Sequence, residues 1–446
     1  GFADDGREYV IDLAPGQRTP MPWVNVVANA GFGFTVSAEG GGYAWSINSQ
    51  KNALTRWTND AVRDDPGDVL YVRDADSGAF WSATPAPARA PTACEVRHGR
   101  GYTRFRQQLA GVASDLVQFV LVHDPVKVSV LRLKNLTDRA RQLDVTAYVQ
   151  WTLGANGEDT AAHVVTARDD VCGALVARND WRADYVGRIA FADLGGQVGE
   201  WTCDRGEFLG AQGHLSAPAA LRQGVPLSGA CGAGLEPCAA LRATVRLQAG
   251  EEREVVFLLG EAADMQSARA LVMRYRQAKP EAILDEVRRH WQDIGDAVQV
   301  TTPDRRLDLL VNGWLPYQII SCRLHARTAF YQASGAWGFR DQLQDVAALV
   351  LSAPHLVREH LLRAAGRQFV EGDVQHWWLP PSGAGVRTRI ADDRLWLPYV
   401  TAHYVRTTGD GGVLDESVAF LEGQPLPDDR IDDFATPKAS SESGTL

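Results

Sequence analysis

The sequence predicts an α+β protein of several domains: an N-terminal antiparallel β-sandwich, a helical linker, and the first part of a helical (α/α) barrel. Three observations predict this fold class. Up to about residue 262, apolar and polar residues alternate, which is the period of a strand with one buried face. From about residue 264, apolar residues recur every three to four positions, as they do on helices. A chain of 446 residues with 45% hydrophobic and 22% charged residues can also bury more than one core.

Residues 1–262 form the predicted sandwich domain. Turn signals such as Asp65-Pro66-Gly67 separate its strands, and no helical pattern lies between them, which favours a large antiparallel sandwich. The span 206–234 is rich in Gly, Ala and Pro, and we interpret it as long surface loops. One predicted strand shows the alternation clearly, with five apolar residues on its single buried face: Leu143, Val145, Ala147, Val149 and Trp151.

Residues 263–300 form the predicted helical linker, with two helices. The second can begin at Pro280, because proline is tolerated in the first turn of a helix.

Residues 301–446 form the predicted N-terminal part of the barrel. Thr302-Pro303-Asp304 is expected to cap its first helix, and residues 341–351 and 355–370 are expected to pair as a helical hairpin. Helices joined by irregular loops continue to about Tyr404. Only four or five helices are present, so we expect an incomplete barrel and a chain cut at both ends. The first helix carries its apolar face on four residues: Leu307, Leu310, Val311 and Trp314.

Composition narrows the class of function. A net charge of −10 argues against a nucleic-acid partner. No run of 18 apolar residues occurs, so we expect no membrane-spanning segment. The six cysteines are scattered and lack metal-site spacing, which favours free thiols in a reducing, cytoplasmic setting and no bound metal.

Two blocks carry the candidate site. Residues 331–345 read YQASGAWGFRDQLQD, and residues 373–399 read DVQHWWLPPSGAGVRTRIADDRLWLPY. Carboxylates and guanidiniums fork to vicinal hydroxyls while indoles stack on C–H faces, so the mixture predicts a sugar site. The alternative is a helical core with ordinary surface ion pairs. The candidate substrate-binding residues are Trp337, Arg340, Asp341, Gln344, Asp345, His376, Trp378, Arg387 and Arg389.

Both blocks resemble glycoside hydrolase family 94, the inverting β-glucoside phosphorylases. Residues 19–60, TPMPWVNVVANAGFGFTVSAEGGGYAWSINSQKNALTRWTND, and residues 124–154 resemble the same family. Within it the chain is most similar to the branch of β-1,2-glucan phosphorylases and cyclic β-1,2-glucan synthases. The resemblance implies a galactose-mutarotase-like super-sandwich and an (α/α)6 barrel. It also implies inorganic phosphate as co-substrate, no other cofactor, and α-glucose 1-phosphate as product.

By this resemblance, Arg340 and Asp345 hold hydroxyls of the glucosyl unit at the cleavage site. Asp341 either does the same or caps a helix that begins near it. His376 either faces the ligand or is an ordinary packed histidine. Arg387 and Arg389 either bind sugar or phosphate, or pair structurally with Asp392 and Asp393.

The family's general acid is an aspartate in a Trp-Asn-Asp motif, and this chain contains no such motif. We therefore expect the acid beyond residue 446, assign no catalytic residue here, and expect the chain alone to be inactive.

The expected partners are a β-glucan oligosaccharide and phosphate, with no nucleic acid and with a homodimer as the expected assembly. The wider polypeptide is expected to be a larger inner-membrane protein of which this is a cytoplasmic region. Two alternatives remain: a non-catalytic carbohydrate-binding module that uses the sandwich, and a hydrolase on a similar (α/α) barrel.

Overall fold

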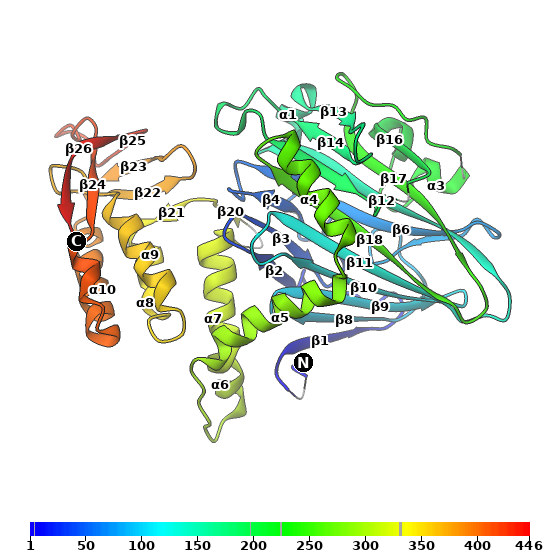
Figure 1. Ribbon diagram of the computed structural model, residues 1–446, viewed down its shortest axis with the longest axis horizontal. Coiled ribbons are helices and arrows are strands. Elements are labelled where there is room, and N and C mark those ends of the chain that lie inside the picture. Colours follow the sequence, from blue (N-terminus) through cyan, green and yellow to red (C-terminus); the bar gives the residue numbers. More distant parts are fainter. Residues whose placement is uncertain (4, 197, 224, 330–331) are drawn as a thin grey trace. The chain divides into compact units, whose positions relative to one another are not determined.

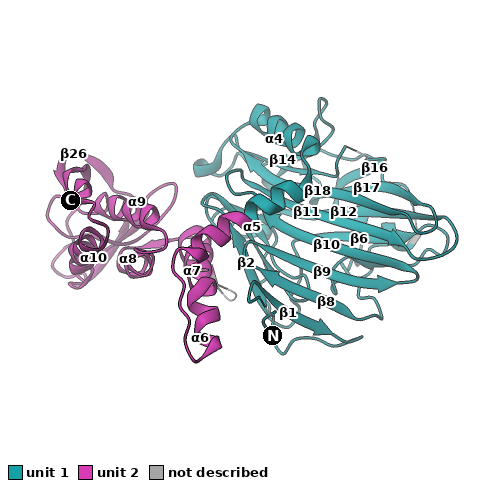
Figure 2. Cartoon of the chain, turned by 60° about the horizontal axis from the view of Figure 1, so that its bottom comes forward, with its two compact units in different colours: residues 1–288, 329–333 teal, residues 289–328, 334–446 magenta. Residues whose placement is uncertain are grey.

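The computed structural model describes residues 1–446 except residues 4, 197, 224 and 330–331. The chain forms two compact units (Figure 2). The first contains Gly1–Arg288 with Ala329–Ala333, and the second contains Arg289–Thr328 with Ser334–Leu446.

The first unit is built on two nine-stranded antiparallel sheets (Figure 1). The first sheet has the strand order β1 (Glu8–Leu13), β8 (Cys94–Gly99), β9 (Tyr102–Leu109), β10 (Val112–Val120), β11 (Val126–Asn135), β18 (Glu252–Ala262), β15 (Ile189–Asp193), β14 (Leu175–Arg178) and β13 (Val165–Arg168). The second sheet has the order β16 (Glu200–Asp204), β17 (Pro237–Leu247), β12 (Arg141–Gly154), β5 (Ala53–Thr55), β4 (Ala44–Ser46), β3 (Phe32–Ser37) and β2 (Val24–Ala28). Strand β6 (Asp68–Asp74) also pairs with β12, and β7 (Phe80–Ser82) pairs with β6.

One apolar core contains buried residues from both sheets, including Phe34, Phe105 and Phe257. The five alternating residues of β12 all belong to this core, as predicted. Strand β12 is nevertheless covered on its other face too, where Tyr148 is buried. The expectation of a single buried face is therefore wrong for this strand.

The cover for that second face comes from the span that we interpreted as surface loops. Short helices α2 (Arg205–Leu209) and α3 (Ala219–Gln223) lie within it. The ring of Phe208 stacks on Tyr148 with their centroids 4.8 Å apart, and Leu221 is fully buried in the same cluster. The loop interpretation is therefore wrong for these helices, whose apolar residues build a second core. The remaining short helices are α1 (Gly157–Thr160), η1 (Ala161–His163) and η2 (Ala183–Tyr185).

Helices α4 (Met265–Gln277) and α5 (Pro280–Asp296) follow the last sandwich strand, as the change of period predicts. The Asp264 carboxylate caps α4 by accepting the Ser267 N–H at 2.7 Å. Pro280 begins α5, and Leu284, Val287 and Trp291 are its buried apolar residues. Within the described ranges, no helix has the length and apolar content that crossing a membrane requires.

The second unit begins with a run of helical turns: α6 (Arg305–Leu309), the π-helical η3 (Leu310–Trp314), α7 (Leu315–Gln318) and the π-helical η4 (Ile319–Ala326). The Asp304 carboxylate caps α6 through the Arg306 N–H, as predicted. Trp314 is buried, but Leu307 and Leu310 are exposed, so the predicted apolar face is only partly covered.

The predicted hairpin is formed by α8 (Phe339–Ala347) and α9 (Pro354–Ala365), and α10 (Asp393–Thr408) and η5 (Gly411–Asp415) follow. The segments between helices are not irregular throughout, as we had expected. A four-stranded antiparallel sheet contains β21 (Trp337–Gly338), β22 (Gln375–Leu379), β23 (Ala384–Thr388) and β25 (Asp432–Ala435). The other strands are β19 (Thr328–Ala329), β20 (Gln332–Ala333), and the pair β24 (Ser417–Glu422) and β26 (Lys438–Thr445).

Candidate functional site

Strand pairing brings the two sequence blocks together. In the β21–β22 register, Trp337 lies opposite Trp378 and Gly338 lies opposite Trp377. Strand β23 can approach β22 only because residue 385 is glycine: a Cβ there would lie 2.0 Å from the Trp377 carbonyl oxygen. Helix α8 follows β21 directly, and α10 begins five residues after β23. The start of each helix therefore lies near this small sheet.

Helix α8 begins two residues earlier than expected. Gly338 occupies the N-cap position, and its N–H donates to the Gln342 side chain at 2.5 Å. Arg340 therefore lies in the first helical turn and not in a preceding loop. Asp341 is exposed and is not the cap, so the capping alternative for this residue is wrong.

Arg340 and Asp392 join the start of α8 to the start of α10. The Arg340 Nη1 donates to Asp392 Oδ2 at 2.7 Å, and both side chains are about half exposed. Among the described residues, the buried Arg340 Nε has no acceptor. Because the side chain is 41% exposed, the outer part of the guanidinium can still donate to a ligand oxygen. The hydrogen bond with Asp392, then its charge, raises the pKa of Arg340.

His376 and Asp393 form a second pair beside it. The ring atom His376 Nδ1 lies 2.7 Å from Asp393 Oδ2. Asp393 is fully buried and its Oδ1 has no partner among the described residues, whereas His376 is about one third exposed. Burial raises the pKa of the Asp393 carboxyl, and the hydrogen bond to His376 opposes that shift. A buried carboxylate on Nδ1 fixes the imidazole orientation and leaves Nε2 for a ligand.

Asp345 lies one turn further along α8. Its Oδ2 accepts the Arg323 Nε–H at 2.9 Å, and its side chain is 19% exposed. Burial raises the pKa of Asp345, while the Arg323 charge lowers it. Gln344 beside it is exposed.

Arg387 and Arg389 are held by other groups than we had considered. Arg387 donates to both Asp373 oxygens at 2.6 Å, and its guanidinium lies 3.8 Å from the Phe369 ring centroid. Arg389 donates to the backbone carbonyls of Arg430, Leu426 and Pro427. The alternative that these arginines pair with Asp392 and Asp393 is therefore wrong, because those carboxylates pair with Arg340 and His376.

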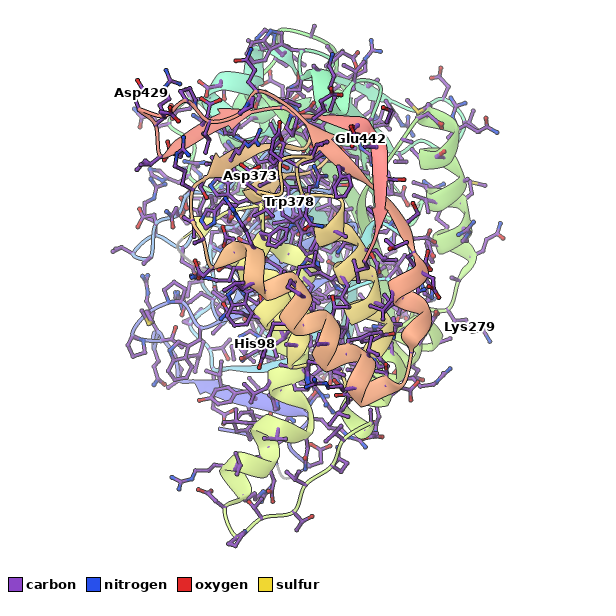
Figure 3. All side chains as sticks on the ribbon, turned by 90° about the vertical axis from the view of Figure 1, so that its left-hand side faces the viewer. His98, Lys279, Asp373, Trp378, Asp429 and Glu442 are labelled. Atoms are coloured by element: carbon purple, nitrogen blue, oxygen red, sulfur yellow. The ribbon has the colours of Figure 1, made fainter. Side chains whose placement is uncertain are left out.

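The two candidate tryptophans are buried. Trp337 is 8% exposed, and the guanidiniums of Arg327 and Arg363 lie 4.5 and 4.4 Å from its ring centroid. Trp378 is 1% exposed, with Arg367 at 5.0 Å (Figure 3, where Trp378 and Asp373 are labelled).

The indoles that keep exposed surface in these blocks are those of Trp377 and Trp396. Sequence reasoning missed the arginines on the buried indoles: Arg363 lies in the last turn of α9, and Arg367 follows two residues after that helix ends.

The arrangement offers a half-exposed guanidinium, an oriented imidazole, the carboxylates Asp341 and Asp345, and two partly exposed indoles. Such groups can bind hydroxyls and the C–H faces of a sugar ring. Among the described residues, no group of three His, Cys, Asp or Glu side chains could hold a metal ion.

A sandwich followed by a helical domain with this kind of polar and aromatic site defines the class of two-domain carbohydrate-active proteins. The family description "Glycosyl hydrolase 94, supersandwich domain" matches residues 7–278. The description "Glycosyl hydrolase 94 superfamily, catalytic domain" matches residues 290–425. The chain belongs to glycosyl hydrolase family 94, as its motifs predicted.

Named relatives agree with this assignment. The chain is 44% identical to the cyclic beta-(1,2)-glucan synthase NdvB of Rhizobium meliloti (strain 1021), over 100% of this chain and 16% of that protein. It is 25% identical to the N,N'-diacetylchitobiose phosphorylase of Vibrio furnissii, over 95% of this chain and 56% of that enzyme. It is 27% identical to the solabiose phosphorylase of Paenibacillus borealis, over 94% and 54%. The chain thus spans only part of each relative.

Solved structures show the same fold at low sequence identity. A bacterial glucoamylase complexed with acarbose matches with a TM-score of 0.50 and 8% identity, over 92% of this chain and 62% of that one. A protein from the human microbiome described as a kojibiose phosphorylase matches with a TM-score of 0.51 and 7% identity, over 87% and 54%. The predicted fold class, a sandwich followed by part of an (α/α)6 barrel, is confirmed.

Proposed function

We propose that the chain is the sandwich and the first part of the catalytic barrel of an inverting phosphorylase that acts on β-1,2-glucan. The observation that carries the proposal is the cluster at the starts of α8 and α10, where Arg340, Asp341, His376 and Asp392 lie together. The choice of glucan rests on the 44% identity to a cyclic beta-(1,2)-glucan synthase.

In this proposal a phosphate oxygen attacks the anomeric carbon opposite the glycosidic oxygen, and the product is α-glucose 1-phosphate. The transition state has oxocarbenium character, as in inverting glycosidases. Phosphate is already an anion, so no second carboxylate has to remove a proton from water. The leaving oxygen still needs a proton from a general acid.

The roles of the described residues follow from what each side chain can still bind. Arg340 and Asp345 bind hydroxyls of the glucosyl unit, Arg340 through the exposed part of its guanidinium. His376, oriented by Asp393 through Nδ1, presents Nε2 to the ligand, where it can accept a hydrogen bond from a sugar hydroxyl. Trp377 and Trp396 supply the partly exposed indole surface. Arg387, Trp337 and Trp378 support the site from within, because their groups are already engaged.

We assign Asp393 to positioning and not to acid catalysis. Its carboxyl is fully buried and one of its oxygens is held by His376, so it cannot reach a glycosidic oxygen without losing that bond. The general acid is therefore proposed to come from another part of the polypeptide.

The test is product formation by the full polypeptide that carries this chain. It is incubated with phosphate and, separately, with β-1,2-gluco-oligosaccharides, cellobiose and N,N'-diacetylchitobiose, and sugar phosphates are followed by ³¹P NMR. We expect α-glucose 1-phosphate from the β-1,2-linked substrate. Faster phosphorolysis of cellobiose or diacetylchitobiose would refute the choice of glucan. Release of free glucose without phosphate consumption would refute phosphorolysis and favour a hydrolase.

A further inference from the structure

A cavity separate from the candidate site lies entirely within the first unit. It has a volume of about 720 Å³ and is lined by segments 18–22, 61–66, 86–89 and 213–216, together with single residues that include Gln150 on β12. This volume is within the range of sites that take small molecules, roughly 300–1,000 Å³. We refer to it as the sandwich cleft. None of its lining residues belongs to the site described above.

The glycine run after β3 packs behind one wall of the sandwich cleft, the 61–66 segment. At Gly41, a Cβ would lie 2.2 Å from the Asp64 backbone oxygen, so only glycine allows the 60–66 loop to approach this closely. The Ser37 hydroxyl then donates to Asp64 Oδ2 at 2.5 Å. The run EGGG of the family-like segment 19–60 therefore fixes the loop that carries Arg63 and Asp65 into the cleft.

Positive charge exceeds negative charge in this cleft. The lining carboxylates are Glu39, Asp64 and Asp65, and the lining guanidiniums are those of Arg18, Arg56, Arg63, Arg89 and Arg205. Glu39 is paired with Arg89, and Asp65 is paired with Arg63 at 2.8 Å. Arg205 is paired with Glu236, which lies outside the cleft.

Two guanidiniums of the sandwich cleft are not paired with a described carboxylate. Among the described residues, Arg18 and Arg56 have no carboxylate within ion-pair distance. Burial and then the Arg18 charge lower the pKa of Arg89, so these two like charges lie within electrostatic range of each other. Arg18 and Arg56 line the same cavity, so an anion bound there would be attracted by two charges that no carboxylate neutralises.

The uncharged lining indicates the kind of anion. Pro20, Pro22, Pro66 and Pro87 line the cleft, whereas no Phe, Tyr or Trp is among its described lining residues, so a neutral sugar lacks the large ring on which it usually stacks. A phosphate group matches several guanidinium forks at once. Gln150, His214 and Ser216 supply donors and acceptors for the hydroxyls of an attached sugar.

We propose that the sandwich cleft binds a phosphate monoester of a sugar, held by Arg18 and Arg56. The preference for a sugar phosphate over free phosphate rests on the proposed function, whose product is such a molecule. The anion site itself rests only on the cleft. Bound product at a second site would let the phosphorylase respond to its own sugar phosphate.

The test is isothermal titration of the 446-residue chain with α-glucose 1-phosphate, inorganic phosphate and glucose. We expect the Arg56→Gln variant to bind glucose 1-phosphate about tenfold more weakly, as loss of one charged hydrogen bond predicts. Arg18→Gln, an exposed position whose change leaves the core intact, should show a loss of the same sign. Arg139→Gln is the matched control, because this exposed arginine pairs with Asp76 elsewhere on the unit and should bind normally.

The outcomes separate the ligand sources and the two sites. If the arginine variants lose equal affinity for glucose 1-phosphate and for inorganic phosphate, the result would support the anion site and show that it recognises the phosphate group alone. Unchanged affinities in both Arg56→Gln and Arg18→Gln would overturn the proposal. So would binding that is lost in Arg340→Lys and kept in Arg56→Gln, because the ligand would then occupy the second unit. Binding through Arg56, together with no phosphorolysis by the full polypeptide that carries the chain, would refute the proposed function alone.

Discussion

Replacing Asp345 by Asn separates a role in sugar binding from a role in folding. The substitution keeps the shape of the side chain and removes its charge, which weakens its acceptance of hydrogen bonds from hydroxyls. In the structure, Asp345 is 19% exposed, and its one ion pair with a described residue is to Arg323, whose side chain is 48% exposed. Burial already raises the pKa of Asp345, so the charged form is disfavoured in the folded protein.

These features predict a small change in stability and a large change in activity. Losing a pair with such an exposed partner costs up to about 1 kcal/mol. The neutral amide avoids the desolvation of a carboxylate, which offsets part of that loss. If Asp345 binds the glucosyl unit in the transition state, kcat/KM should fall roughly 10²-fold, about 2.7 kcal/mol of transition-state binding. Arg340→Lys should lower kcat/KM to a similar degree, because it keeps the charge but loses the planar fork.

Two measurements test this reasoning. Phosphorolysis rates are measured on the full polypeptide that carries the chain, and thermal unfolding is measured on the 446-residue chain. Asp433→Asn is the control, since this exposed aspartate pairs with Arg430 outside the cluster and should leave both quantities nearly unchanged. Near-normal kcat/KM for Asp345→Asn together with a clearly lowered Tm would refute the assignment and make Asp345 a structural residue.

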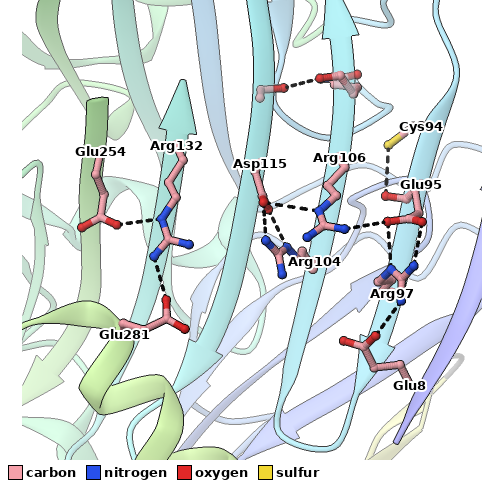
Figure 4. A network of polar contacts seen from close by, with 12 residues as sticks. Glu8, Cys94, Glu95, Arg97, Arg104, Arg106, Asp115, Arg132, Glu254 and Glu281 are labelled. Carbon is pink, nitrogen blue, oxygen red and sulfur yellow. Dashed lines mark hydrogen bonds and ion pairs between the residues drawn. The ribbon is translucent and has the colours of Figure 1, made fainter. Parts of the chain in front are cut away.

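Three further predictions concern the chain itself. The 446-residue chain alone should release no glucose 1-phosphate from β-1,2-glucan, because it contains no Trp-Asn-Asp motif to supply the general acid. Protonation of the leaving group typically raises the reaction rate about 10²–10⁴-fold. Measurable release would contradict this prediction. Burial lowers the pKa of His98 to about 4 in the folded protein. As the pH falls from 7 to 5, the His98 imidazole therefore takes up a proton in the unfolded chain but stays mostly neutral in the folded one. The free energy of unfolding should fall by about 2 kcal/mol over this range. Urea unfolding at both pH values should show a smaller difference in His98→Gln. Asp115 pairs with Arg104 and Arg106 in the ion-pair network on the first sheet (Figure 4). Asp115→Asn should therefore lower the free energy of unfolding by about 1 kcal/mol at low salt and by less at high salt. Equal losses at both salt concentrations would refute an electrostatic cause.

The fold could be predicted from the sequence where the pattern of apolar residues is long. Strand β12 and helices α4 and α5 span 11 residues or more, and their periods distinguish strand from helix. Helices α2 and α3 contain five residues each, which is too short for a helical period to appear. From the sequence these residues were therefore interpreted as surface loop, although Phe208 and Leu221 are fully buried.

The location of the candidate site could also be predicted, because its residue types are concentrated in two short blocks. The ion-pair partners of the site residues could not be predicted. The pairs Arg340–Asp392 and Arg323–Asp345 join residues that are 52 and 22 positions apart, and only the packing of the helices brings them together. The two-strand contact between Trp337 and Trp378 depends on a register that neither block reveals alone.

The structure divides the nine candidate residues by what each can still bind. Arg387 and Arg389 donate to carboxylates and carbonyls of their own unit, and the indoles of Trp337 and Trp378 are covered by guanidiniums. A ligand could use these groups only by breaking contacts that already satisfy them. Arg340, Asp341, Gln344, Asp345 and His376 keep exposed surface, and they lie on α8 and on the strand next to it. Under the proposed function, recognition of a sugar therefore rests on the first turns of α8, while the sequence block from 373 to 399 mainly holds those turns and His376 in place.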